Sequence, residues 1–176
     1  PRTFNTSFRY RLDDEGVAVA EKGIEDAHRD LPITLALNPA IGSVEFAHQG
    51  VTYRRDGSSA VEDQVSIVYV KRVVDAENSN LSSTRFAFVV TSNERVSLAL
   101  PVRETGEGVH LVDLHDDTPR LFLDFPLIGT ESFPLPVAVN SSFFQPGEKR
   151  NGIWLTDADT VAASTNRELF EDAVKI

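Results

Sequence analysis

Apolar residues spaced three and four apart predict a helix close to the start of the chain. The residues that share this helical face are Val17, Ala20, Ile24, Ala27 and Leu31. Asp13-Asp14-Glu15 precedes them and supplies a capping side chain and negative charge, both of which stabilise a helix N-terminus. A residue that precedes proline avoids the helical conformation, so we expect Pro32 to end the helix near Asp30.

Extended segments are predicted on both sides of this helix. Residues 1–12 alternate roughly between apolar and polar side chains, which is typical of a strand. Residues 31–46 are apolar and contain Pro32 and Pro39, and their pattern fits a buried helix or a buried strand. The last part of this block, residues 41–46, favours a strand that leads to a turn at Gly50.

Short strands follow one another through the middle of the chain. Alternating apolar residues between turns predict strands over residues 64–74, 84–92, 95–102, 109–114 and 120–125. Asn93-Glu94 lies between two of these strands and indicates a hairpin. Asp56-Gly57-Ser58-Ser59 has the composition of a plain loop. The chain is therefore expected to form an antiparallel sheet.

A second helix is predicted at the end of the chain. Its apolar face comprises Val161, Ala162, Thr165, Leu169, Ala173 and Ile176. Thr156-Asp157-Ala158-Asp159 lies ahead of it and resembles a capping box. We expect Trp154 to anchor the sheet near this helix. Together the elements predict an α+β fold in which helices pack against one face of an antiparallel sheet, in a single domain that spans residues 1–176.

Composition and charge narrow the classes of function. The 176 residues are 41% apolar and 25% charged, an ordinary globular mixture that is long enough to bury a core. The chain has no cysteine, which excludes disulfides and thiolate metal sites and suits a reducing cytoplasm. A net charge of −10 repels nucleic-acid phosphates and anionic lipids, and no apolar run reaches membrane-spanning length. We therefore expect a cytoplasmic protein that binds neither nucleic acid nor membrane.

The start of the chain indicates that it belongs to a longer protein. It begins with Pro1-Arg2-Thr3 and contains no methionine. We therefore expect a fragment cut or cloned from a longer chain, rather than a naturally processed product.

One cluster of ionisable residues is a candidate for metal binding or acid–base chemistry. Its members are His110, Asp113, His115, Asp116 and Asp117. On a strand, however, His110 and Asp113 face opposite sides of the sheet, because successive side chains alternate. Asp116-Asp117-Thr118-Pro119 also has the composition of a turn. A turn is therefore the favoured interpretation, and a metal-assisted hydrolase is the least favoured hypothesis.

Residues 146–152 form a charged turn between apolar segments. The simplest interpretation is a solvated loop. The functional alternative is that Lys149 or Arg150 reaches a phosphate group that another domain supplies, since a guanidinium fork pairs well with phosphate oxygens. The chain has no phosphate-binding glycine loop, no dinucleotide-binding glycine motif and no GxSxG nucleophile elbow of its own.

Residues 121–155 resemble a known family. The motifs that carry the likeness are FPLIGTE at 125–131, FPLPV at 133–137, VNS at 139–141, FQP at 144–146 and RNGI at 150–153. Together they look like sacsin-type repeats and the large bacterial ATP-binding proteins related to them. Those proteins are similar to the heat-shock-chaperone and gyrase class of ATPases, often called GHKL. Residues 3–12 and 31–46 are also similar, so the likeness spans most of the chain.

The resemblance implies that the chain is one module of a larger ATP-binding protein. In such proteins the pattern follows the ATP-binding domain, and the Glu…Asn box, the Asp-x-Gly-x-Gly motif and the glycine-rich lid of that domain do not occur here. The fragment would then be an α+β middle or transducer module, not catalytic alone. It would couple the nucleotide state of an adjacent ATP-binding domain to conformation or to a client protein. ATP and Mg²⁺ would belong to the parent chain, which is a possible ATPase.

In related modules a lysine or arginine contacts the terminal phosphate, in the manner of an arginine finger. Arg150 is the first candidate for this role and Lys149 the second. The alternative to the whole proposal is an independent β-rich domain that binds a protein or a ligand and has no link to ATP.

Overall fold

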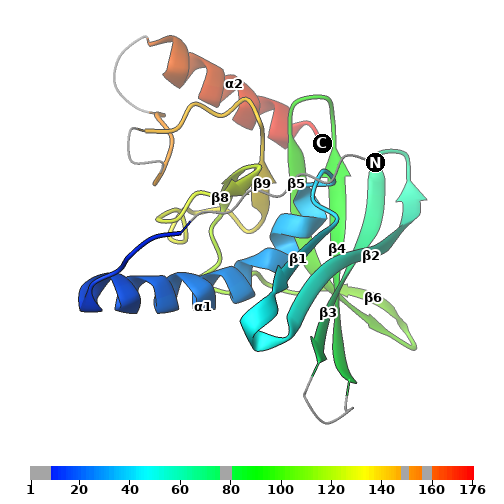
Figure 1. Ribbon diagram of the computed structural model, residues 1–176. Helices are drawn as coiled ribbons and strands as arrows, with labels where there is room; N and C mark the ends of the chain where they lie inside the picture. Colours follow the sequence, from blue (N-terminus) through cyan, green and yellow to red (C-terminus); the bar gives the residue numbers. More distant parts are fainter. Residues whose placement is uncertain (1–8, 76–80, 148–150, 156–159) are drawn as a thin grey trace, which may run out of the picture.

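A long helix, a curled sheet and a second helix make up the structure (Figure 1). The computed structural model describes residues 9–75, 81–147, 151–155 and 160–176. The helices are α1 (Asp14–Leu37), the short 3-10 helix η1 (Ala47–Gln49) and α2 (Val161–Val174). The strands are β1 (Ser43–Phe46), β2 (Val51–Glu62), β3 (Val65–Asp75), β4 (Leu81–Ser92), β5 (Ser97–Thr105), β6 (Gly108–Leu111), β7 (Leu121–Leu123), β8 (Phe125–Pro126) and β9 (Ala138–Asn140). Within these described ranges, no helix combines the length and the apolar character that crossing a membrane requires.

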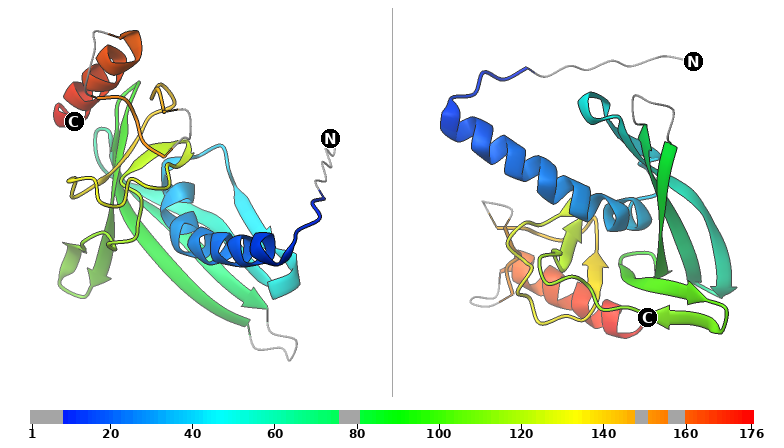
Figure 2. Two further views of the ribbon diagram at one scale, coloured as in Figure 1. Left: turned by 90° about the vertical axis from the view of Figure 1, so that its left-hand side faces the viewer. Right: turned by 90° about the horizontal axis from the view of Figure 1, so that it is seen from below.

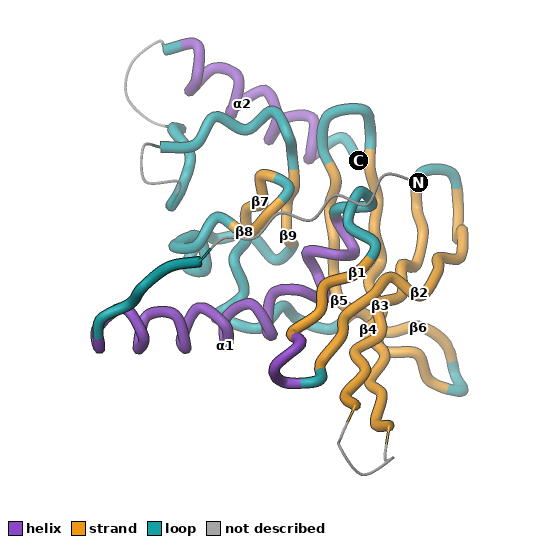
Figure 3. Tube along the Cα trace, in the orientation of Figure 1, coloured by secondary structure: helices purple, strands orange, loops and turns teal. Residues whose placement is uncertain are grey.

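The strands form one sheet in the order β1-β2-β3-β4-β5-β9-β7-β8, and β6 also pairs with β5. Neighbouring strands are antiparallel, except that β7 and β9 are parallel. The sheet curls into a half-barrel (Figures 2 and 3). The predicted α+β class is therefore confirmed. The prediction of a purely antiparallel sheet is wrong, because the long connection between β7 and β9 brings the chain back in the same direction.

Helix α1 begins where the sequence predicts but continues well past the predicted end. The Asp13 side chain accepts a hydrogen bond from the Gly16 N–H at 2.8 Å and so caps the N-terminus. The helix does not end near Asp30 but runs through Pro32 to Leu37. A proline inside a helix costs about 3 kcal/mol, because it removes an N–H group and crowds the preceding turn.

Two tertiary features offset the cost of Pro32. Pro32 has no N–H group for the carbonyl of His28, and the hydroxyl of Tyr53 in β2 donates to that carbonyl instead, at 3.2 Å. The turn beyond the proline carries the buried side chains of Ile33, Leu35 and Leu37. Full burial of one such side chain contributes about 1.5–3 kcal/mol. Packing therefore outweighs the local preference, and residues 31–37 take the helical alternative.

The buried apolar side chains form two clusters. The first joins the last turns of α1 to strands β2, β3 and β4, and includes Ile33, Leu35, Leu37, Tyr53, Val70 and Phe88. The second joins α2 to β7, β9 and the connections around them, and includes Val96, Leu121, Leu127, Val139, Phe144 and Leu169. Because α1 and α2 contribute to different clusters, the structure does not show the predicted packing of the helices against one face of the sheet.

The closing helix is confirmed as α2, whereas Trp154 does not have its predicted role. Thr160 caps α2 by accepting from the Ala163 N–H at 3.2 Å, and the predicted capping box at residues 156–159 lies outside the described residues. The Trp154 side chain is 53% exposed. Instead, the buried Asn166 amide donates to the carbonyls of Trp154 and Gln145, both at 2.9 Å. The backbone of this segment, rather than its indole ring, is therefore fixed to the helix.

Residues 56–59 have the composition of a turn but do not form a loop. The predicted loop there is wrong, because these residues belong to β2. The register between β2 and β3 shifts between Arg55 and Ser58, and Gly57 has a φ of 97°. The small and polar residues therefore form a bulge inside a strand rather than a loop.

The Asn93-Glu94 hairpin is confirmed by the antiparallel pairing of β4 and β5. Of the strand predicted over residues 1–12, residues 9–12 have no regular structure, and residues 1–8 lie outside the described ranges.

Candidate functional site

The two residues proposed to reach a phosphate, Lys149 and Arg150, lie outside the described residues. The ends of their turn are described. Pro146 and Ile153 form an antiparallel bridge, and the Gly147 N–H donates to the Gly152 carbonyl at 2.9 Å. The turn is thus closed at its base, and the role of its two cations stays a prediction.

The histidine and aspartate cluster does not form a metal site in the described part of the chain. His110 lies on β6, and its Nε2 bonds the Thr105 hydroxyl at 3.1 Å. His115 lies in the next loop, and its Nδ1 accepts from the Asp117 N–H at 3.2 Å. No three His, Asp or Glu side chains of the described residues are placed to share a metal ion. The Thr118 N–H donates to the His115 carbonyl at 2.9 Å, which confirms the turn predicted in this segment.

A groove runs along α1 and is open to solvent. We call it the α1 groove. Its volume is about 660 Å³. Its sides come from three segments that are distant in sequence: α1, β1 and residues 125–128. The lining residues are Val19, Lys22, Gly23, Asp26, Ala27, Asp30, Leu31, Thr34, Val44, Phe46, Phe125, Pro126 and Ile128.

The walls of the α1 groove carry large apolar side chains that remain exposed. Val19 is 67% exposed, Phe125 56% and Ile128 52%. Single exposed apolar residues are common on proteins, but several that converge on one groove mark a binding surface. Only the last turns of α1 are buried, so the apolar face predicted from Val17 to Leu31 is partly left uncovered.

One wall of the groove is built by the FPLIGTE motif. Leu127 and Thr130 point inward and are buried, and the Thr130 hydroxyl donates to the Leu127 carbonyl at 2.8 Å. Gly129 has a φ of 106°, and a Cβ there would lie 3.1 Å from the Asn151 carbonyl oxygen. Only glycine fits such a position without strain. These inward contacts hold the tight turn that leaves Phe125 and Ile128 facing outward.

The floor of the groove holds a buried carboxylate. Asp30 is 2% exposed, and the Arg29 guanidinium donates to both of its oxygens, at 2.8 and 2.9 Å. The same guanidinium donates to Asp26 at 2.9 Å. Burial raises the pKa of Asp30 despite this pairing, and the charges of Asp26 and Glu131 act in the same direction. Asp30 thus carries a charge that its surroundings solvate poorly.

The charged side chains of the groove are engaged in ion pairs. The ionisable side chains among its described lining residues are Lys22, Asp26 and Asp30. Both carboxylates are engaged by Arg29, and Lys22 Nζ lies 3.6 Å from Asp26 Oδ1.

Sequence reasoning did not identify this groove. Asp26 and Asp30 are four residues apart and flank Ala27 and Leu31 on the apolar side of the predicted helix. Residues four apart are neighbours on one face of a helix. The two carboxylates beside the apolar face were therefore the feature of the sequence that could have predicted the acidic floor. The meeting of α1 with Phe125 and Ile128 depends on long-range packing, which the local pattern does not specify.

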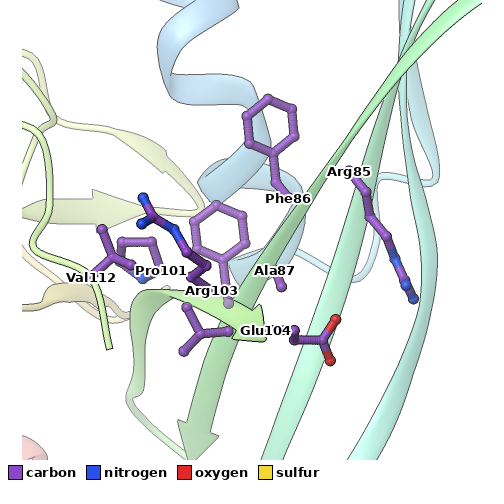
Figure 4. A pocket seen from close by; sticks show the side chains of 9 residues that line it. Arg85, Phe86, Ala87, Pro101, Arg103, Glu104 and Val112 are labelled. Atoms are coloured by element: carbon purple, nitrogen blue, oxygen red, sulfur yellow. The ribbon is translucent and has the colours of Figure 1, made fainter. Parts of the chain in front are cut away.

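A second cavity, of about 480 Å³, lies where β4 and β5 separate (Figure 4). The two strands pair only as far as Ala87 and Val102. Figure 4 shows Phe86 and Arg103 pointing away from Arg85 and Glu104.

A polar cluster spans the gap between the separated strands. The Tyr69 hydroxyl of β3 donates to Glu104 of β5 at 2.8 Å, and the Arg85 guanidinium lies 3.7 Å from the centre of the Tyr69 ring. These contacts join β3 to β5 across β4.

Comparison with protein-family models, with curated proteins and with solved structures finds no significant match. The resemblance of residues 121–155 to sacsin-like proteins therefore rests on the motifs themselves.

Proposed function

We propose that the chain is a middle or transducer-type module of a sacsin-like, chaperone-type ATP-binding protein. The module would couple the nucleotide state to conformation or to contact with a client protein, and would not be catalytic alone. One observation carries the proposal: Phe125, Pro126 and Ile128, which belong to the motif that resembles this family, line the open apolar groove along α1. A motif that presents apolar side chains to solvent is suited to contact with another polypeptide.

The proposal gives each part of the parent protein a role. The adjacent ATP-binding domain of the same chain is the first partner of the module and holds ATP with Mg²⁺. Arg150, or else Lys149, reaches the terminal phosphate from the charged turn. The module is one unit within residues 1–176 of a longer cytoplasmic protein, to which the absence of cysteine is suited.

The test is the ATP turnover of the parent protein. Arg150→Ala is expected to lower turnover by about 100-fold or more, since an arginine finger contributes roughly 10³–10⁵-fold. Ile128→Asp, which disrupts the groove, is expected to change turnover by about 5-fold or more, which is a typical size for coupling between sites. Leu111→Asp is the matched control, because Leu111 is 68% exposed and lies on β6, outside the groove lining.

The outcomes separate the parts of the proposal. If Arg150→Ala leaves turnover unchanged, Arg150 has no part in the mechanism, and Lys149→Ala tests the second candidate. If Ile128→Asp and Leu111→Asp act alike, the groove does not couple to the nucleotide, and the transducer function is contradicted.

The alternative is an independent β-rich domain that binds a protein or a ligand without ATP. The observation that favours it is that the described residues of this chain line the α1 groove by themselves. The parent gene distinguishes the two. A Glu…Asn box and an Asp-x-Gly-x-Gly motif upstream of Pro1 support the transducer module, and their absence supports the independent domain.

A further inference from the structure

We propose that the open edge of β4 (residues 81–86) binds an extended segment of another polypeptide as an added strand, and that this segment places a carboxylate opposite Arg85. Two features point to this occupant: unpaired backbone groups along the edge, and a row of cations that ends at Arg85. The surface is separate from the α1 groove, so the inference does not rest on the proposed function.

The edge of β4 is open because β5 turns away from it. The two strands pair only as far as Ala87 and Val102, and β5 continues with β6 on its other side. Figure 1 shows the β5–β6 hairpin leaving the sheet beside the ends of β3 and β4. Among the described strands, residues 81–86 therefore pair with β3 alone. At about 3.3 Å per residue the open edge is about 20 Å long.

Three residues of β4 direct their backbone groups to the open side. The Ser92 N–H donates to the carbonyl of Gln64, the residue before β3, at 3.3 Å. The register between β3 and β4 is unbroken, and alternate residues of a strand direct their N–H and C=O groups to opposite neighbours. Leu81, Ser83 and Arg85 therefore direct these groups away from β3, and all three residues are exposed. Such an edge is a template on which an extended peptide adds as a strand.

A row of cations crosses three neighbouring strands and ends at this edge. Arg54 of β2 lies opposite Lys71 of β3, and Lys71 lies opposite Arg85 of β4. Directly opposite residues share one face of a sheet, and like charges in such positions are destabilising. Among the described residues, no carboxylate lies within ion-pairing distance of these three side chains. The next position in the row belongs to the strand added at the open edge, which can supply the missing carboxylate.

The acids of the neighbouring strands leave this position unfilled. On the same face of β3 and β4, Asp75 lies opposite Leu81, at the far end of the edge. Continued past its last paired residues, the register of β4 with β5 would place Glu104 opposite Arg85. The strands separate instead, and the Glu104 carboxylate accepts from the Tyr69 hydroxyl at 2.8 Å. Figure 4 shows Arg85 and Glu104 on the same side of the gap.

The same requirement argues against a second copy of this chain as the occupant. Two copies could pair their β4 edges with each other. However, β4 contains no aspartate or glutamate between Leu81 and Ser92, so the β4 of a second copy cannot supply a carboxylate opposite Arg85. A different polypeptide with an acidic side chain in an extended segment meets both requirements of the edge.

The experiment uses the 176-residue protein and synthetic peptides of about eight threonine and valine residues, a composition that favours strands. Three peptides differ only at one central position, which is glutamate, glutamine or lysine. Fluorescence anisotropy is expected to show that the glutamate peptide binds about 3-fold more tightly than the glutamine peptide and about 10-fold more tightly than the lysine peptide, since a cross-strand charge pair contributes roughly 0.2–1 kcal/mol.

Two further versions of the glutamate peptide test the addition of a strand. Each carries N-methyl groups on alternate residues, so that one edge or the other edge of the peptide cannot donate hydrogen bonds. At least one of these versions is expected to bind about 10-fold more weakly than the parent peptide, because an added strand is held by its main-chain hydrogen bonds.

Variants of the protein locate the binding. Arg85→Gln is expected to reduce the preference for glutamate over lysine from about 10-fold to about 2-fold, because it removes the cation at the edge. Arg54→Gln is the matched control and is expected to keep the preference, since Arg54 is exposed on the same face but lies two strands, or about 9.6 Å, from Arg85. Both side chains are exposed, so their replacement is compatible with folding.

Ser83→Pro tests the backbone of the edge. The Ser83 N–H faces the open side, so proline removes a free donor and leaves the pairing with β3 in place. Binding of the glutamate peptide is expected to weaken by about 5-fold or more, since one hydrogen bond is lost and the proline ring crowds the edge. Ser83→Thr keeps the N–H group and is expected to bind within about 2-fold of the wild type.

Three results would overturn the inference. Equal binding of the three peptides, or equal effects of Arg85→Gln and Arg54→Gln, would show that no carboxylate is placed opposite Arg85. Undiminished binding of both N-methylated peptides would show adhesion by charge without an added strand. A dimer of the protein alone in size-exclusion chromatography that Ser83→Pro dissociates would place a second copy at the edge. No ATP is present in these measurements, so their outcome is separate from that of the turnover assay.

Discussion

Single polar side chains complete backbone hydrogen bonding where the local sequence leaves it incomplete. Tyr53 supplies the donor that Pro32 lacks, by bonding the His28 carbonyl at 3.2 Å. Its oxygen is also 3.1 Å from Nδ1 of His28. Asn166 acts similarly, since its side chain bonds the backbone of Gln145 and Trp154. In both cases a partner distant in sequence decides a local conformation.

Tyr53→Phe tests this role at the residue scale. The ring stays in place, but the part-buried His28 carbonyl loses its donor, so we expect the free energy of unfolding to fall by about 1–2 kcal/mol. Tyr69→Phe is the matched control, because the Tyr69 hydroxyl bonds Glu104 at an exposed position. Its expected cost is about 0.5 kcal/mol or less. Urea unfolding measures both. Equal losses in the two variants would show that Pro32 needs no replacement donor.

At the scale of the element, the end of α1 is held by a side chain from the sheet. The last turn of α1 contains no basic residue of its own. Arg55 of β2 donates through Nη1 to the carbonyls of Leu35 and Ala36, at 2.6 and 3.0 Å. A cation at this end also faces the negative end of the helix dipole. Burial lowers the pKa of Arg55. The contact therefore joins the helix to the sheet at the point where the core begins.

Arg55→Ala is expected to reduce the free energy of unfolding by about 1.5–3 kcal/mol, since it removes charged hydrogen bonds from two helix-terminal carbonyls. Arg54→Ala is the control, because Arg54 is the exposed neighbour in the same strand. Its expected change is within about 0.5 kcal/mol. Thermal unfolding followed by circular dichroism measures both. If Arg54→Ala proves as costly, the loss reflects charge on β2 rather than the capping of α1.

Across the whole molecule, features set by local pattern could be predicted and features set by distant contacts could not. The alternation of apolar and polar side chains predicted the β4–β5 hairpin, and the capping side chain of Asp13 predicted the start of α1. The continuation of α1 past Pro32 depends on Tyr53, and the bulge at Gly57 depends on the register with β3. Neither partner lies near the residue it affects in sequence, so local propensity gave the wrong prediction at both.

In the candidate site too, local features were predictable from the sequence and long-range contacts were not. The FPLIGTE motif was visible in the sequence, but its outward face was not, because Leu127 and Thr130 turn inward only against the second cluster and β7. The predicted site residues Lys149 and Arg150 lie outside the described ranges and stay predictions. The groove itself needs three distant segments to meet, which no local pattern specifies.

The response of stability to pH tests the charge of the groove within the folded molecule. The raised pKa of Asp30 means that the folded protein holds this proton more tightly than the unfolded chain does. The stabilising contribution of Asp30 is therefore fully present below the ordinary aspartate pKa of about 3.9 and is lost as the pH rises through the higher folded-state pKa.

Asp30→Asn isolates this effect, because the amide keeps the shape of the side chain and does not titrate. The free energy of unfolding of the wild type minus that of Asp30→Asn is expected to fall as the pH rises from about 4, and to become constant above the folded-state pKa. Urea unfolding at a series of pH values gives the difference directly, and the carboxylates distant from Asp30 cancel in it. A difference that increases with pH would show that the Arg29 pair outweighs burial. The floor of the α1 groove would then be a satisfied ion pair that stabilises the folded protein.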